Sequence, residues 1–170
     1  MACGKTTLGR AISNAGYADF VDLDEFITAR SGMTPAEWFA GKGEEAFRQA
    51  EIAALEDIVN QVVESRHQVI ATGGGTPCSI GAMDLMLGRG TVVWLEASLD
   101  RTVARLLEAE GKRPLVAGMD EAKLRRFIPI HRGERNIFYR RAHARVDSSL
   151  LDNEEEIKLT VADFVSRFKI

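Results

Sequence analysis

Residues 1–15 read MACGKTTLGRAISNA, and the stretch GKTT at residues 4–7 decides how the rest of the chain is interpreted. This stretch matches the second half of a phosphate-binding loop, G-x-x-x-x-G-K-[ST], which normally follows a buried strand. In such a loop the backbone amides close round a phosphate, and the N-terminus of the next helix adds partial positive charge. Residues 8–15 continue with a helical pattern that contains no proline. The motif therefore indicates an anion-binding site at the start of this helix.

The first half of the same motif is missing. In this register the first glycine would lie two residues before Met1, and no apolar strand leads into the loop. The alternative interpretation is that Lys5 is an ordinary lysine near a frayed terminus. We expect instead that Met1 is an internal methionine of the loop. An in-frame apolar run ending in glycine should then precede Met1 in the coding sequence.

The composition is that of one globular domain. The chain has 170 residues, of which 45% are hydrophobic and 28% charged, and its formal net charge is −3. Such a chain can bury a core, but it has no global positive field to hold nucleic acid or an anionic membrane. Two cysteines, Cys3 and Cys78, are too few for a disulfide framework, and no stretch resembles a signal peptide or a membrane span. We expect a cytoplasmic monomer with a single domain, residues 1–170.

Hydrophobic periodicity and turn residues place the helices and strands. Strand patterns cover residues 17–22, 68–72, 91–96 and 144–147, and helical patterns cover residues 5–15, 24–31, 35–41, 44–64, 80–87 and 99–110, a helix from about residue 121 and a closing helix through residues 157–168. Strands separated by helices predict an α/β fold of three layers, with a parallel sheet and helices on both faces. Glycine and proline with little periodicity predict a mobile lid over about residues 108–120.

Two carboxylates follow the first predicted strand. Alternate residues of a strand point to the same side, so Asp22 and Asp24 can both face the carboxyl edge of the sheet, where parallel sheets bind ligands. One acid can assist magnesium through water, and the other can accept a hydrogen bond or a proton from a substrate hydroxyl. The alternative is that Asp24 caps a helix beginning at Glu25.

Glycines and arginines supply further candidates. Three consecutive glycines, Gly73 to Gly75, are costly in backbone entropy and useful where a ligand must approach the main chain. Arg48 lies one turn before Glu51, so the two can pair, and a surface salt bridge is the plain alternative. Arg113, in the expected lid, can reach a nucleotide phosphate on closure.

The arginines between residues 125 and 145 do not indicate a nucleic-acid face, because no aromatic platforms are interleaved with them. We expect most of them on solvated helix surface. The histidines, His67, His131 and His143, lack the spacing of a metal site.

Six short motifs occur in the order and approximate spacing found in shikimate kinases: GKTTLGR, FVDLDEFI, GEEAFRQAE, ATGGG, KRPL and GERNIFYRR. The chain thus resembles that family over essentially its whole length. The resemblance implies a P-loop kinase fold of the nucleoside monophosphate kinase group, with a substrate-binding segment over about residues 24–65 and a nucleotide lid. It implies transfer of the ATP γ-phosphate to the 3-hydroxyl of shikimate, a step of chorismate and aromatic amino-acid synthesis.

The resemblance also implies roles for individual residues. For ATP it implies Ala2, Cys3, Gly4, Lys5, Thr6, Thr7 and Arg113, and for Mg²⁺ it implies Thr6 and, through water, Asp22. For shikimate it implies Asp24, Arg48, Gly73, Gly74, Gly75 and Arg135, with Glu51 steadying Arg48 and with Phe39 and Phe47 as apolar walls. Asp24, Lys5 and Arg113 would be the catalytic residues. A planar guanidinium suits the shikimate carboxylate, because it can donate two parallel hydrogen bonds.

The chain departs from the family pattern in two places. The match of Arg135 depends on the motif GERNIFY, in which many members have proline at the position of Ile137. Because this chain lacks that proline, Arg140 is an alternative to Arg135 as the second carboxylate-binding arginine. The family's first strand, which lies in the middle of its sheet, is missing. Two other functions remain open: a different small-metabolite kinase of the same fold, such as a gluconate kinase, and a nucleotide-binding module without catalysis. Turnover of shikimate compared with gluconate separates the kinases.

Overall fold

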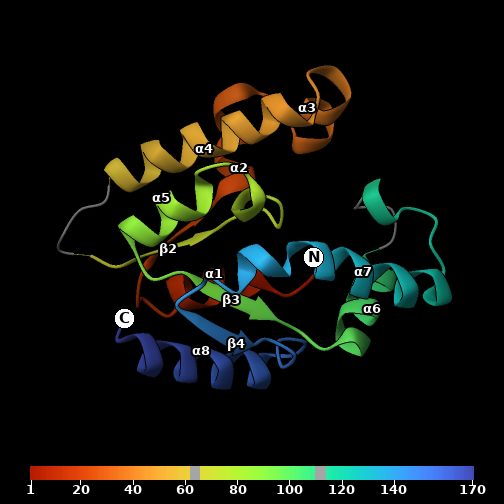
Figure 1. The fold of residues 1–170 in the computed structure, drawn as a ribbon. Helices are drawn as coiled ribbons and strands as arrows, with labels where there is room; N and C mark the ends of the chain where they lie inside the picture. Colours follow the sequence, from red (N-terminus) through yellow and green to blue (C-terminus); the bar gives the residue numbers. More distant parts are fainter. Residues whose placement is uncertain (62–65, 110–113) are drawn as a thin grey trace.

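A computed structural model describes residues 1–61, 66–109 and 114–170 (Figure 1). The helices are α1 (Lys5–Asn14), α2 (Leu23–Ser31), α3 (Pro35–Gly41), α4 (Glu44–Asn60), α5 (Ala82–Arg89), α6 (Leu99–Glu108), α7 (Glu121–Tyr139) and α8 (Glu154–Phe168). The strands are β1 (Asp19–Asp22), β2 (Gln68–Ala71), β3 (Val93–Glu96) and β4 (Ala144–Asp147), and the short 3₁₀ helices are η1 (Thr76–Cys78) and η2 (Pro114–Val116). Helices and strands alternate along the chain, as the sequence predicts.

The described strands form two separate parallel pairs. β1 pairs with β2 in a register that sets Asp19 opposite Gln68, and β3 pairs with β4 in a register that sets Val93 opposite Ala144. Parallel neighbours need helical crossovers, and each pair here is joined through helices. The prediction that neighbouring strands are parallel is therefore correct.

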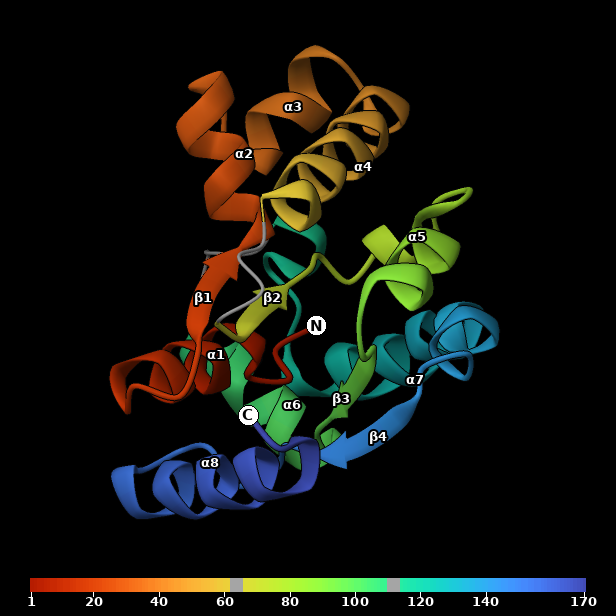
Figure 2. The same ribbon diagram turned by 90° about the vertical axis from the view of Figure 1, so that its left-hand side faces the viewer.

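A gap separates β2 from β3, and the N-terminal residues lie beside it (Figure 2). It contains a cavity of about 290 Å³. Val69 of β2 lines the cavity on one side, Val93 and Leu95 of β3 line it on the other, and Phe164 and Phe168 of α8 also contribute. Among the described residues no strand pairs with the inner edge of β2 or of β3. This arrangement agrees with the expectation that the central strand is missing.

Helices cover both faces of the strand pairs. On one face α1 and α8 pack through Leu8, Ile12, Val161 and Phe164, which form a buried cluster with Val146 of β4. On the other face α2 and α4 pack against Val21 of β1 and Ile70 of β2, and Figure 2 shows these two helices above the strands. Burying such aliphatic side chains is the dominant favourable term in folding, at about 25 cal/mol for each Å² removed from water. The three-layer prediction is confirmed.

Two further hydrophobic clusters pack pairs of helices together. One joins α2 to α4 through Leu23, Ile27 and Leu55. The other joins α6 to α7 through Val103 and Leu124, and the N-terminal Met1 and Ala2 pack against it. The residues that precede α1 are thereby held against α6.

Some predicted element boundaries are wrong by a few residues, and local hydrogen bonds explain why. The strand predicted from residue 17 begins at Asp19, because the Tyr17 N–H still closes α1 by donating to Ile12 O at 3.2 Å. The helix predicted from residue 80 begins at Ala82, after Gly81 in the left-handed region at φ 80°. α4 ends at Asn60, and the predicted extension to residue 64 falls mostly outside the described residues.

No helix among the described residues is long and apolar enough to cross a lipid bilayer.

Candidate active site

The loop before α1 requires glycine at one position. Gly4 is the N-cap of α1 with φ 80°, in the left-handed region that side chains rarely adopt. A Cβ there would also lie 2.5 Å from Leu151 Cδ1. Lys5 follows directly, and its Nζ lies 3.7 Å from Cys3 Sγ. The helix N-terminus and the lysine together make a positively charged end suited to a phosphate.

All of the N-terminal residues predicted to bind ATP line one cavity of about 360 Å³. Its lining residues are Ala2, Cys3, Gly4, Lys5, Thr6, Thr7, Arg105, Glu108 and Ala109. Arg105 was not found by sequence reasoning, because a single arginine on the polar side of an amphipathic helix carries no motif. Its guanidinium donates to Ser148 O at 3.1 Å and Ser149 O at 3.0 Å, and its Nε donates to Asp152 at 2.7 Å. Arg105 therefore ties the loop after β4 to the wall of this cavity.

The two predicted magnesium residues lie side by side. Thr6 Oγ1 donates to Asp22 Oδ2 at 2.7 Å, across a sequence separation of 16 residues. Asp22 is also the N-cap of α2, since its Oδ1 accepts from the backbone N–H of Asp24 at 3.1 Å. The alternative in which Asp24 is the helix cap is therefore wrong.

Asp24 is positioned by helix α2, whereas the sequence predicts that strand β1 positions it. β1 ends at Asp22, and Asp24 is already in the first turn of α2, so strand alternation does not align the two acids. Burial, Asp22 and Glu51 raise the pKa of Asp24, and Lys5 and Arg48 oppose the rise. A half-buried carboxyl with a raised pKa, set between two cations and two acids, is a candidate proton acceptor.

Side chains from other elements lie so close to the three glycines that little room remains for a Cβ atom. A Cβ at Gly73 would lie 2.6 Å from Glu51 Oε1, and one at Gly74 would lie 3.1 Å from Arg135 Nη1. At Gly75 a Cβ would lie 2.7 Å from Arg48 Nη1. Each glycine thus allows a different candidate residue to approach the turn, which explains why all three positions lack a side chain.

Arg48 is held by a buried carboxylate. Its Nη1 donates to Glu51 Oε2 at 2.6 Å, and the Glu51 side chain is 0% exposed. The other Glu51 oxygen accepts a hydrogen bond from Thr76 Oγ1, which is buried at the start of η1. The interpretation of Arg48 and Glu51 as a surface salt bridge is therefore wrong. Thr76 joins this network, although no sequence motif indicates it.

Aromatic rings flank the Arg48 guanidinium. Its Cζ lies 5.6 Å from the Phe39 ring centroid and 5.8 Å from the Phe47 ring centroid, and the two ring centroids are 5.0 Å apart. Phe47 is buried, whereas Phe39 is 42% exposed and can face a ligand. Rings at these distances attract the cation and restrict its movement.

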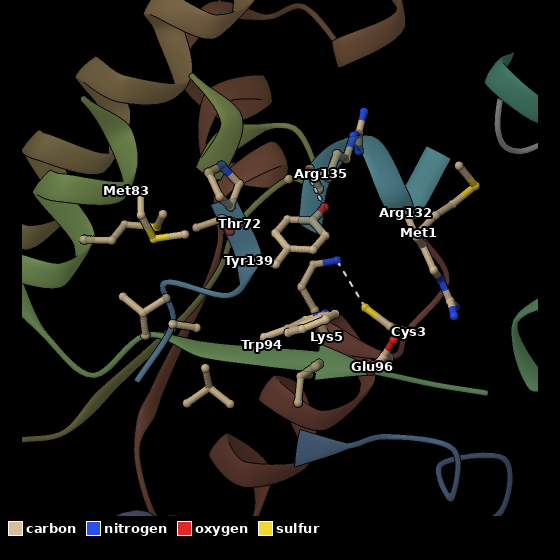
Figure 3. A pocket seen from close by; sticks show the side chains of 18 of the residues that line it. Met1, Cys3, Lys5, Thr72, Met83, Trp94, Glu96, Arg132, Arg135 and Tyr139 are labelled. Carbon is tan, nitrogen blue, oxygen red and sulfur yellow. Dashed lines mark hydrogen bonds between the residues drawn. The ribbon is translucent and has the colours of Figure 1, made fainter. Parts of the chain in front are cut away.

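A smaller cavity of about 100 Å³ connects the phosphate loop to the glycine turn (Figure 3). Lys5, Gly74, Arg135 and Tyr139 are among its lining residues. The structure therefore brings together the predicted residues Lys5, Asp24, Arg48 and Arg135 with the glycine turn, while Thr6 and Asp22 lie at the adjoining end of α1.

The family profile for shikimate kinase matches residues 1–166. The chain belongs to the shikimate kinase family. A shikimate kinase of Parabacteroides distasonis is 34% identical over 157 residues, which are 92% of this chain and 88% of that protein. The crystal structure of shikimate kinase from Bacteroides thetaiotaomicron has a TM-score of 0.92 and 31% identity, and covers 100% of this chain and 94% of that one. Shikimate kinase from Acinetobacter baumannii in complex with shikimate has a TM-score of 0.76 and 27% identity, and covers 99% of this chain and 89% of that one.

Within this shikimate kinase fold the two alternative arginines differ in place. Arg135 lies against Gly74, one turn before the end of α7. Arg140 caps the end of the same helix and is exposed. The geometry favours Arg135 as the partner of Arg48. The predicted lid arginine, Arg113, lies outside the described residues and stays a prediction.

Replacing Gly75 by alanine should lower kcat/KM for shikimate about 10²-fold, because the added Cβ displaces the Arg48 guanidinium and misplacement of a positioning group by about 1 Å costs that much. Steady-state kinetics measures the change. Gly88→Ala is the matched control, since a Cβ there meets nothing within 4 Å. Equal kinetics for the two variants would contradict the role given to Gly75.

Thr76→Val should lower the free energy of unfolding by about 1–3 kcal/mol, because it leaves one oxygen of a buried carboxylate without its donor. Chemical denaturation measures this loss. Thr76→Ser keeps the hydroxyl and should retain most of the stability. A Thr76→Val protein as stable as the parent would show that Glu51 does not depend on this bond.

Proposed function

We propose that the protein transfers the γ-phosphate of ATP to the 3-hydroxyl of shikimate. The observation that supports the proposal is the glycine turn. Asp24 lies near Gly73, Arg135 near Gly74 and Arg48 near Gly75. A carboxylated ring with hydroxyl groups offers a partner to each: the carboxylate to the guanidinium groups and a hydroxyl to Asp24. Gluconate is also a hydroxylated carboxylate, but it has no ring to lie against Phe39.

The two arginines would bind the carboxylate of the substrate. Glu51 neutralises much of the charge on Arg48 and fixes its orientation, so that little side-chain entropy is lost when the ligand binds. Arg135 approaches from α7 and lies against Gly74, whereas Arg48 lies against Gly75. A ligand held at two points from two elements has one orientation, and this presents a single hydroxyl to Asp24.

Asp24 would bind the reacting hydroxyl and accept its proton as phosphate transfer proceeds. A raised carboxyl pKa makes the ionised group a stronger proton acceptor. Lys5 would lie on the phosphates, where positive charge offsets the negative charge of the transferring group. Positioning and charge neutralisation would therefore supply most of the catalysis.

Thr6 and Asp22 fit a magnesium ion. Their oxygens are 2.7 Å apart at the start of α1, and Mg²⁺ prefers a few oxygen ligands together with waters and substrate phosphates. When bound, the ion would neutralise phosphate charge. Thr6 would contact it directly and Asp22 through water.

The proposal is tested by measuring ATP consumption with shikimate, with gluconate and with no acceptor. We expect consumption that depends on shikimate and exceeds that with gluconate. Equal rates with and without shikimate, together with measurable nucleotide binding, would favour a binding module without catalysis.

A further inference from the structure

Tyr139 contacts the glycine turn directly. It is the last residue of α7, one helical turn after Arg135, so both side chains lie on the same face of the helix. Its hydroxyl donates a hydrogen bond of 2.6 Å to Gly74 O, and Figure 3 shows it beside Arg135 at the cavity between the phosphate loop and the turn. Burial raises the pKa of Tyr139, so the phenol remains a proton donor at neutral pH.

This hydrogen bond fixes a peptide plane in the middle of the site. The Gly74 carbonyl and the Gly75 N–H belong to one trans peptide unit and point in opposite directions, and the structure has no cis peptide bonds among its described residues. Holding the carbonyl therefore sets the direction of the Gly75 N–H. Within the described part of the chain, neither Gly74 N–H nor Gly75 N–H donates to a protein acceptor. These groups can serve a ligand oxygen.

Glycine makes such a fixing contact necessary. A run of three glycines has more accessible backbone conformations than any other sequence, so the turn loses its geometry unless other elements hold it. Thr76 N donates to Gly73 O at 3.3 Å on one side of the turn, and the Tyr139 hydroxyl holds the central carbonyl. The Tyr139 ring is itself held, since its centroid lies 5.7 Å from that of Trp94 in β3.

We propose that Tyr139 is a positioning residue for the acceptor substrate, which acts by orienting the Gly74–Gly75 peptide beside Arg135. It does not contact the nucleotide loop through any described hydrogen bond. Its effect should therefore fall on the acceptor and spare ATP. This inference rests on the proposed function, and it adds a residue from the end of α7 to the acceptor site.

Tyr139→Phe removes the hydroxyl and keeps the ring against Trp94. We expect the shikimate KM to rise about three- to tenfold, as for the loss of one neutral hydrogen bond, with the ATP KM changed less than twofold. The melting temperature should stay close to that of the parent. Tyr17→Phe is the matched control, because Tyr17 is 46% exposed and far from the turn in the chain, and its kinetics should equal those of the parent.

A second variant separates packing from positioning. Tyr139→Leu loses both ring and hydroxyl, so it should lower the melting temperature as well as raise the shikimate KM. An unchanged shikimate KM in Tyr139→Phe, or equal rises in both KM values, would overturn the inference while leaving the proposed function intact. A parent protein without shikimate-dependent ATP consumption would overturn both.

Discussion

Asp24→Asn should lower kcat for shikimate phosphorylation by about 10²–10⁴-fold, the range that a positioned general base contributes. The substitution keeps the size of the side chain and removes its ability to accept a proton. Nucleotide binding should persist, since Asp24 lies in α2 and is not among the residues that line the phosphate-loop cavity. Single-turnover kinetics together with ATP titration measures the two effects separately.

Glu25→Gln is the matched control for this variant. Glu25 is the next residue of α2, but it is exposed and pairs with Arg10 on the surface. Its substitution should leave kcat unchanged. Unchanged turnover in Asp24→Asn would contradict the role of Asp24 as proton acceptor.

The raised pKa of Asp24 predicts how the melting temperature of Asp24→Asn should differ from that of the parent as the pH changes. Because the folded-state pKa lies above the ordinary value of 3.8, ionised Asp24 opposes folding, and this cost grows as the pH rises from 3.8 through the raised pKa. Asp24→Asn removes the cost, so its melting temperature at pH 7 should equal or exceed that of the parent. The difference should shrink as the pH falls towards 3.8, and kcat of the parent should fall over the same range.

Arg48→Ala should raise the shikimate KM by about 10- to 150-fold, since a hydrogen-bonded charged contact contributes about 1.5–3 kcal/mol. The ATP KM should change little. The variant also leaves Glu51 buried without its cation, which is destabilising. Arg48→Lys keeps a charge for Glu51 but lacks the planar fork, so it should preserve stability better while still raising the shikimate KM. Equal changes in the KM of both substrates would contradict the assignment of Arg48 to the shikimate carboxylate.

The same assay separates Arg135 from Arg140. Arg135→Ala should raise the shikimate KM, because the guanidinium lies against Gly74. Arg140 is exposed at the end of α7, and Arg140→Ala should have the kinetics of the parent. The reverse result would move the second carboxylate contact to Arg140.

Local signals predicted most of the fold. Ser98, Thr34 and Asp120 cap the starts of α6, α3 and α7 with side-chain hydrogen bonds, and each cap is readable from a single residue and its neighbours. The strand at Ala144–Asp147 falls where the sequence places it. The start of α2 was misplaced, because Asp22 and Asp24 are both good caps and the sequence does not rank them.

The predicted site residues Arg48, Arg135 and Asp24 belong to motifs with a recognised role. Tyr139, Thr76 and Arg105 had no predicted role, because they act through contacts with distant segments. The hydrogen bond from Tyr139 to Gly74 spans 65 residues of sequence, and the one from Arg105 to Ser149 spans 44. Such contacts depend on how α6 and α7 pack against the strands, which no local pattern encodes.

³¹P NMR of the product formed from ATP and shikimate tests the proposed reaction most directly. The arrangement of Asp24 and the arginine pair predicts a single new phosphate monoester on the 3-hydroxyl, formed at the rate at which ADP appears and about 10²–10⁴-fold more slowly with Asp24→Asn. Formation of ADP and free phosphate alone, or of a monoester on another hydroxyl, would contradict it.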